Sequence, residues 1–240
     1  MHEDEIWDEE RWEAFLREND RRVNRFMDLL FNFLTEHPLP EEGDEAGRRF
    51  WESQLRDFLE GQGFYPEDHG YGFFFDLFDT EDEADEEEEA GVGWFGLEDE
   101  EAFDDEALFE DALQSFRELP VYQQAFRLAT EVLEWANALP GDVKDSTLVQ
   151  FCTHVTQIPA NIAKGHGIGY ERDMIGGNIA CAKRGLAAAN AALGLLREMK
   201  AAPYMPPDVY RRLYEQAFEV RNELGLYVQD LRRRFDLGID

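Results

Sequence analysis

Helical periodicity runs through the C-terminal half of the chain with only short breaks, and this constrains the fold more than any other feature. Apolar residues recur there at three- and four-residue spacing, the pattern of a helix with one buried face. The pattern predicts helices over residues 121–139, 146–164, 171–200 and 207–235. Four amphipathic helices joined by short loops predict an all-α fold, with an up-down four-helix bundle over residues 116–240.

The second predicted helix contains a proline, Pro159, which removes a backbone hydrogen bond and costs about 3 kcal/mol in a helix interior. The sequence leaves two alternatives open: the helix kinks at Pro159, or it ends near Gln157 and restarts. Asn161 is expected to offer its side chain to a freed carbonyl. Ser146 is expected to cap this helix, and the glycine-rich stretch from Gly165 is expected to close it with a turn.

Residues 1–62 show a second helical region, with helices predicted over residues 3–36 and 45–60. Prolines at 38 and 40 end the first helix, and glycines at 61 and 63 end the second. A hairpin of two such helices buries little surface by itself, so we expect it to dock on something else. The residues predicted to face inward are Trp12, Phe15, Leu16, Val23, Phe26, Met27, Leu30, Leu34, Phe50, Trp51, Leu55, Phe58 and Leu59.

Residues 63–115 form an acidic, aromatic-rich segment that is predicted to be largely irregular. The stretch from Phe116 to the end holds 15 basic and 15 acidic residues, so the whole net charge of −31 lies in the first 115 residues. Acid runs repel and stay solvated. The aromatic residues either pack on the chain's own domains or bind a protein partner with a basic surface. The candidate partner-binding aromatics are Phe73, Phe74, Phe75, Phe78, Trp94 and Phe95.

The stretch IPANIAKGHG, which begins at Ile158, resembles a bacterial four-helix-bundle family. That family includes the intervening-sequence proteins encoded inside some large-subunit ribosomal RNA genes and the accessory variability proteins of diversity-generating retroelements. The resemblance covers about residues 116–240, and Lys164 departs from it by replacing the usual acid. The motif residues, expected to be structural or to lie at an interface, are Ile158, Pro159, Ala160, Asn161, Ile162, Ala163, Gly165 and Gly167.

The resemblance implies assembly into pentameric rings. It also implies nucleic-acid binding beside a reverse transcriptase, since the retroelement members are basic. Residues 116–240 are neutral overall, so the strong electrostatic attraction that phosphate binding needs is absent here. The remaining basic clusters are candidate nucleic-acid contacts or ordinary solvated faces: Lys183, Arg184, Arg211, Arg212, Arg232, Arg233 and Arg234.

The sequence offers no set of catalytic residues. The four helices contain no Glu-x-x-His, the motif of carboxylate-bridged metal pairs, and His154 and His166 are isolated in the sequence. Two cysteines, Cys152 and Cys181, predict buried thiols in a reducing cytoplasm. The start of the chain does not read as a secretory signal, and no apolar run predicts a membrane span. We therefore expect a cytoplasmic protein that is not an enzyme, with no cofactor and no metal.

Two functions remain open. The first is an oligomeric adaptor that assembles through the small residues of the third predicted helix and binds a protein partner through its acidic arm. The second is an accessory protein of a reverse-transcriptase system, which binds nucleic acid and whose acidic arm modulates that binding.

Overall fold

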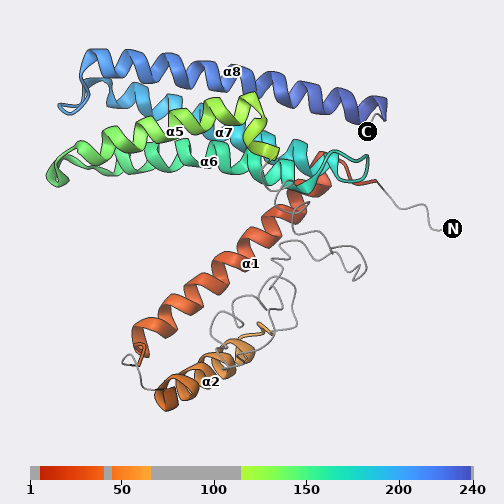
Figure 1. The fold of residues 1–240 in the computed structure, drawn as a ribbon, viewed down its shortest axis with the longest axis vertical. Helices are drawn as coiled ribbons and strands as arrows, with labels where there is room; N and C mark the ends of the chain where they lie inside the picture. The colour runs from red at the N-terminus through yellow and green to blue at the C-terminus, as the bar shows by residue number, and fades with distance from the viewer. Residues whose placement is uncertain (1–5, 41–44, 66–114, 239–240) are drawn as a thin grey trace. The chain divides into compact units, whose positions relative to one another are not determined.

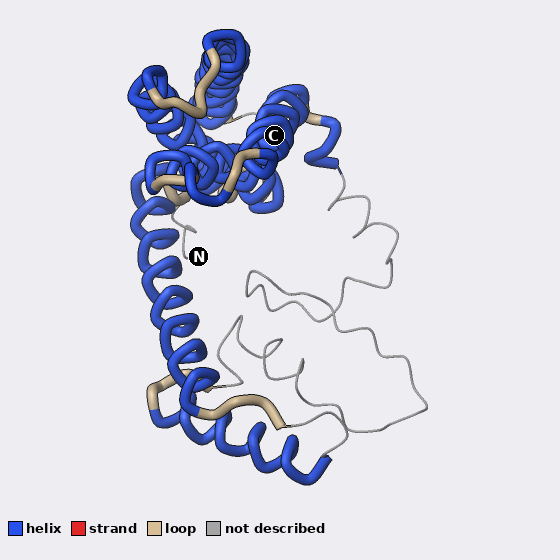
Figure 2. The backbone as a smooth tube through the Cα atoms, turned by 90° about the vertical axis from the view of Figure 1, so that its left-hand side faces the viewer, coloured by secondary structure: helices blue, strands red, loops and turns tan. Residues whose placement is uncertain are grey.

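The computed structural model describes residues 6–40, 45–65 and 115–238. Within these ranges the chain consists of helices and connecting loops, without a strand (Figure 1, Figure 2). The predicted all-α class is confirmed. The chain divides into two units: unit 1 is formed by residues 1–16 and 104–240, and unit 2 by residues 17–103. Of the described residues, 6–16 are thus grouped with the C-terminal helices.

Unit 1 is built around four long helices, α5 (Pro120–Ala138), α6 (Ser146–Ile168), α7 (Ile175–Glu198) and α8 (Pro207–Leu237). Each helix packs against the next in sequence, α5 also packs against α8, and the four lie side by side in Figure 1. Short 3-10 turns occupy Phe116–Glu118, Gly141–Val143 and Met199–Ala201. One core joins the helices, and its fully buried side chains include Leu128, Leu148, Phe151, Ile158, Ile162, Ile179, Leu196, Leu213 and Leu224.

Helix α6 is longer than predicted. It runs without a break through Pro159, Gly165 and Gly167, and ends at Ile168 beside Gly169, whose φ is +120°. The predicted turn at Gly165 was wrong. A Cβ on Gly165 would lie only 2.7 Å from the side-chain oxygen of Asn178 on α7, so this glycine provides space for close helix packing.

The start of α6 is capped by Asp145, and Ser146, the predicted cap, is the first helical residue. The Leu148 amide donates to Asp145 Oδ1 at 2.8 Å, and the Tyr204 hydroxyl donates to Asp145 Oδ2 at 2.8 Å. The bond from Leu148, followed by that from Tyr204, lowers the pKa of the Asp145 carboxyl. An aspartate is the stronger cap because its charge also complements the helix dipole.

Unit 2 contains most of α1 (Glu9–Glu36) and all of α2 (Glu45–Gly61). Their shared core consists of Phe26, Leu30, Phe33, Trp51, Leu55, Leu59 and Phe64. Three residues predicted to face inward are exposed: Phe15, Val23 and Phe50, the last by 66%. A single inward face for α1 was the wrong assumption, because Leu16 packs on α7 whereas Phe26 and Leu30 pack with α2.

One stretch of the described chain, Ile175–Ala201, meets the length and composition expected of a membrane span. The sequence analysis predicted no such stretch. The 18-residue window that meets this criterion has a mean hydropathy of 1.2. Of that window, 56% is buried inside the structure, as in a core helix.

Candidate functional site

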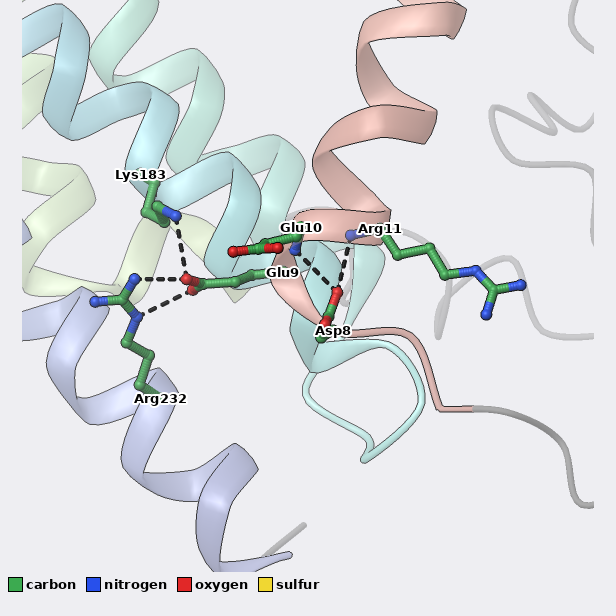
Figure 3. Close-up of polar contacts among 6 residues, drawn as sticks. All are labelled: Asp8, Glu9, Glu10, Arg11, Lys183 and Arg232. Carbon is green, nitrogen blue, oxygen red and sulfur yellow. Dashed lines mark hydrogen bonds and ion pairs between the residues drawn. The ribbon is translucent and has the colours of Figure 1, made fainter.

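The first described residues of the chain, 6–16, pack on helices α7 and α8 within unit 1. We call residues 6–16 the α1 segment. The residues that receive it are the α7–α8 surface: Gly176, Gly177, Ala180, Cys181, Lys183, Arg184 and Arg232. Asp8 caps the segment's helix, since its Oδ1 accepts from the amides of Glu10 at 3.1 Å and Arg11 at 2.9 Å (Figure 3).

The apolar half of this contact depends on small residues in α7. Leu16 is fully buried against Ala180 and Cys181. A Cβ on Gly176 would collide with the backbone oxygen of Trp7, and one on Gly177 would lie 2.9 Å from the Trp12 ring. Only glycine therefore allows the start of the α1 segment to approach α7 this closely.

The polar half of the contact consists of ion pairs from acids of the α1 segment. Glu9 accepts from Lys183 Nζ at 3.1 Å and from Arg232 Nη2 at 2.6 Å and Nε at 3.0 Å (Figure 3). Glu13 accepts from Arg184 Nε at 2.8 Å. The hydrogen bond from Arg232 is the main cause that lowers the pKa of the Glu9 carboxyl. Glu9 thus joins the basic side chains of α7 and α8 at one point.

Burial of apolar side chains contributes more to this contact than the ion pairs do. Burying a leucine side chain such as Leu16 stabilises by about 1.5–3 kcal/mol, whereas an exposed ion pair contributes about 0–1 kcal/mol. Lys183 and Arg232 remain nearly half exposed at 45% and 47%. We infer that Leu16 and Trp12 hold the α1 segment in place and that the charges fix its position along α7.

The predicted basic clusters have separate surroundings in the structure. Lys183, Arg184 and Arg232 converge on the α1 segment, whereas Arg212 pairs with Glu131 of α5. The last two arginines pair within α8 with Asp230, Arg234 at 3.1 Å and Arg233 at 3.8 Å. Arg211 lies exposed on α8.

The motif residues behind the family resemblance lie on α6. Ile158 and Pro159 are buried in the core, and Ala160 is exposed. Asn161 Nδ2 donates to the carbonyl of Gln157 at 2.7 Å. The carbonyl that Pro159 deprives of its helical donor is that of Val155, so Asn161 does not serve the freed carbonyl. Gly167 is exposed, with open space around its Cβ position.

A chain of hydrogen bonds that the sequence did not reveal links α6, α7, α8 and Ser115, the residue before the first 3-10 turn, at this end of α6. It runs from Ser115 Oγ to His166 Nε2 at 2.5 Å, from His166 Nδ1 to Tyr170 Oη at 2.8 Å, and from there to Tyr227 Oη at 2.9 Å. Tyr227 reaches Asn178 Oδ1 in a long contact of 3.5 Å, and Asn178 Nδ2 donates to the Gly169 carbonyl at 3.2 Å. His166 is therefore not isolated.

The fully buried Asn178 fixes the direction of this chain of bonds. Its Oδ1 can only accept, so Tyr227 donates to it and accepts from Tyr170. Tyr170 then accepts from Nδ1–H of His166, which leaves Nε2 free to accept from the Ser115 hydroxyl. Burial lowers the pKa of His166 and raises that of Tyr227, which favours the neutral forms this order requires. An asparagine on a helix face of small apolar residues was the one sequence signal for such a network.

The lowered pKa of His166 predicts that unit 1 loses stability as the pH falls below about 6.5. In that range the unfolded chain takes up the proton first, so its free energy falls relative to the folded state. The contribution of His166 to the free energy of unfolding is fully present above the unfolded-state pKa. Replacing His166 with Gln removes this titration, so urea unfolding of the variant should depend less on pH between 7.5 and 5.5.

The matched control is His154→Gln, at the half-buried His154 that contacts Gln157 on the same helix. This variant leaves the hydrogen bonds of His166 in place, so the His166 variant is compared with it as well as with wild type. Equal slopes for wild type and the His166 variant would contradict the network.

One shallow hollow of about 830 Å³ lies along α5, lined by Arg117, Tyr122, Gln123, Phe126, Arg127, Thr130, Glu131 and Glu134. Its lining contains no histidine, cysteine or serine, and Ser115 and His166 do not line it. Across the described ranges, no group of three or more metal-ligating side chains gathers. Cys181 is buried and Cys152 is half buried, and burial raises the pKa of the Cys152 thiol.

The candidate partner-binding aromatics lie outside the described residues: Phe73, Phe74, Phe75, Phe78, Trp94 and Phe95.

Comparisons of the chain with protein-family models, curated proteins and solved structures found no match.

Proposed function

We propose that the chain is a non-enzymatic oligomeric adaptor, and that α5–α8 form the up-down bundle of the family that the IPANIAKGHG stretch resembles. In this proposal the bundle is the assembly module, as a pentameric ring if the resemblance extends that far. The acidic, aromatic N-terminal half binds a protein partner with a basic surface. One observation carries the proposal: an acidic, aromatic helical segment of this chain already binds a basic surface, through Glu9, Trp12, Glu13 and Leu16.

Exposed apolar side chains on unit 1 support assembly. Large hydrophobic residues are exposed on three helices, and an assembly that buried them would gain the free energy of removing their apolar area from water. They are Phe126 and Leu133 on α5, Val149 on α6, and Phe218 and Leu226 on α8.

The second candidate is a nucleic-acid-binding accessory protein. The observation that favours it is the convergence of Lys183, Arg184 and Arg232 from two helices. The observation against it is that Glu9 and Glu13 already neutralise these cations, while phosphate binding depends on free positive charge.

Binding of single-stranded RNA and DNA by the full chain, measured across a salt series, decides between the two. The adaptor proposal expects no binding at about 0.15 M salt, because the net charge is −31. The second candidate expects binding that weakens with salt and whose salt dependence flattens when Arg232, Arg233 and Arg234 are replaced with alanine. Assembly itself is tested by the molar mass of the full chain in solution, which should be at least twice the 27.9 kDa of one chain.

A further inference from the structure

The small residues of α7, which the sequence singles out for assembly, are already covered inside the chain. Gly176 and Gly177 lie under Trp7 and Trp12, and Ala180 packs under Leu16. Further along α7, Gly185 meets Leu224 of α8 and the backbone of α6. Assembly through the first turns of α7 therefore needs a partner segment that replaces the α1 segment on this surface. Such a partner must have the shape and charge of the α1 segment.

The α7–α8 surface is specific for such a segment. It requires a helix with an apolar pair at four-residue spacing, as in Trp12 and Leu16, because these side chains fill the room left by glycines and alanine. It also requires acids one turn apart, as in Glu9 and Glu13, to meet cations on α7 and α8. A second copy of this chain carries this combination by definition.

The covalent link between the α1 segment and its surface is long. Roughly 90 residues of chain, from 17 to 103, separate the segment from the rest of unit 1. The effective concentration that a linker gives to an attached segment falls as the linker lengthens. A neighbouring copy's segment therefore competes more readily with the chain's own than it would across a short loop.

We propose that the oligomer forms by exchange, in which the α1 segment of one copy seats on the α7–α8 surface of another copy. This inference rests on the proposed assembly. The exchanged contact repeats the cis contact: Leu16 on Ala180, Glu9 on Lys183 and Arg232. Because segment and surface are different patches, the contact is heterologous, so exchange closes either as a reciprocal pair or as a ring.

Charge reversal on the two sides of the contact tests the exchange in full-length protein. The segment variant carries Glu9→Lys and Glu13→Lys, and the surface variant carries Lys183→Glu, Arg184→Glu and Arg232→Glu. Each variant repels itself in cis and between identical copies. In a mixture, both possible contacts between the variants are complementary. All five positions are partly solvent-accessible, so far-ultraviolet circular dichroism should show that both variants fold.

Charge reversal weakens the cis contact and the exchanged contact of a single variant alike, so the test lies in the mixture. The expected result is that the two variants associate with each other about tenfold more tightly than either associates with itself. A tagged segment variant should then retain the untagged surface variant on an affinity resin, and about 0.5 M salt should weaken this retention. Wild-type protein that is oligomeric, together with a mixture in which the two variants associate no more tightly with each other than with themselves, would overturn exchange and leave the adaptor proposal standing. Monomeric wild type would overturn both.

Discussion

Replacing Gly165 with alanine is expected to lower the stability of unit 1 by about 1–3 kcal/mol. The added Cβ would lie 2.7 Å from Asn178 Oδ1, 3.1 Å from the Asn178 backbone oxygen and 3.1 Å from Cys181 Cβ. Asn178 is fully buried and hydrogen-bonded to the Gly169 carbonyl, so it cannot withdraw without breaking that bond. Two of the three contacts involve atoms that cannot swing aside. Urea unfolding followed by circular dichroism measures the loss.

Gly167→Ala is the matched control, two residues away on the same helix. No atom lies within 4 Å of its Cβ position, so alanine meets open space. Alanine is favoured over glycine in a helix by about 1 kcal/mol, so this variant should be as stable as wild type or more so. If both variants unfold at the same urea concentration, the close packing of α6 on α7 is absent. The pair also separates two motif glycines that the sequence presents as equivalent.

Replacing Gly176 with alanine is expected to release the α1 segment from α7. The new Cβ would collide with the backbone oxygen of Trp7 and lie 3.1 Å from the backbone carbon of Asp8 and 2.8 Å from the Trp12 ring. Backbone atoms cannot move without lifting the segment. Amide hydrogen exchange across residues 9–16 should then accelerate by about tenfold or more, which corresponds to about 1.4 kcal/mol of lost protection.

The control for this release is Gly194→Ala near the other end of α7, where no atom lies within 4 Å of the Cβ position. Its hydrogen exchange across residues 9–16 should match wild type. A second comparison uses the Trp12 indole, whose buried Nε1–H has no acceptor among the described residues. Trp12→Phe should keep the segment seated, because it removes an unsatisfied donor and keeps a ring, whereas Trp12→Ala should release it. Equal exchange rates in the Gly176 and Gly194 variants would show that the segment does not seat on α7.

Local pattern predicted most of the helices. The three- and four-residue spacing of apolar residues predicted the ends of α5 and α8 to within one or two residues. Pro207 is the first residue of α8, as predicted. The end of α6 was missed because glycine is a poor helix former by local propensity. Tertiary packing against Asn178 outweighs that propensity at Gly165, and packing across the fold is not visible in a local window.

The candidate site could not be predicted from the sequence for a related reason. Glu9 and Arg232 are 223 positions apart, and nothing in a single sequence pairs one acid among many with one arginine. The same holds for Ser115 and His166, 51 positions apart. The sequence did show the residues that form the contact: glycines at 176 and 177, basic pairs on two helices, and an acidic helix with aromatic residues. Their juxtaposition arises only from the fold.

The molar mass of the full-length chain in solution tests the adaptor proposal most directly. Light scattering coupled to size-exclusion chromatography, at micromolar protein and about 0.15 M salt, should give a molar mass at least twice the 27.9 kDa of one chain. A mass near five times that of one chain would agree with the pentameric ring that the resemblance implies. A mass of 27.9 kDa across the micromolar range would contradict assembly, and with it the exchange of the α1 segment.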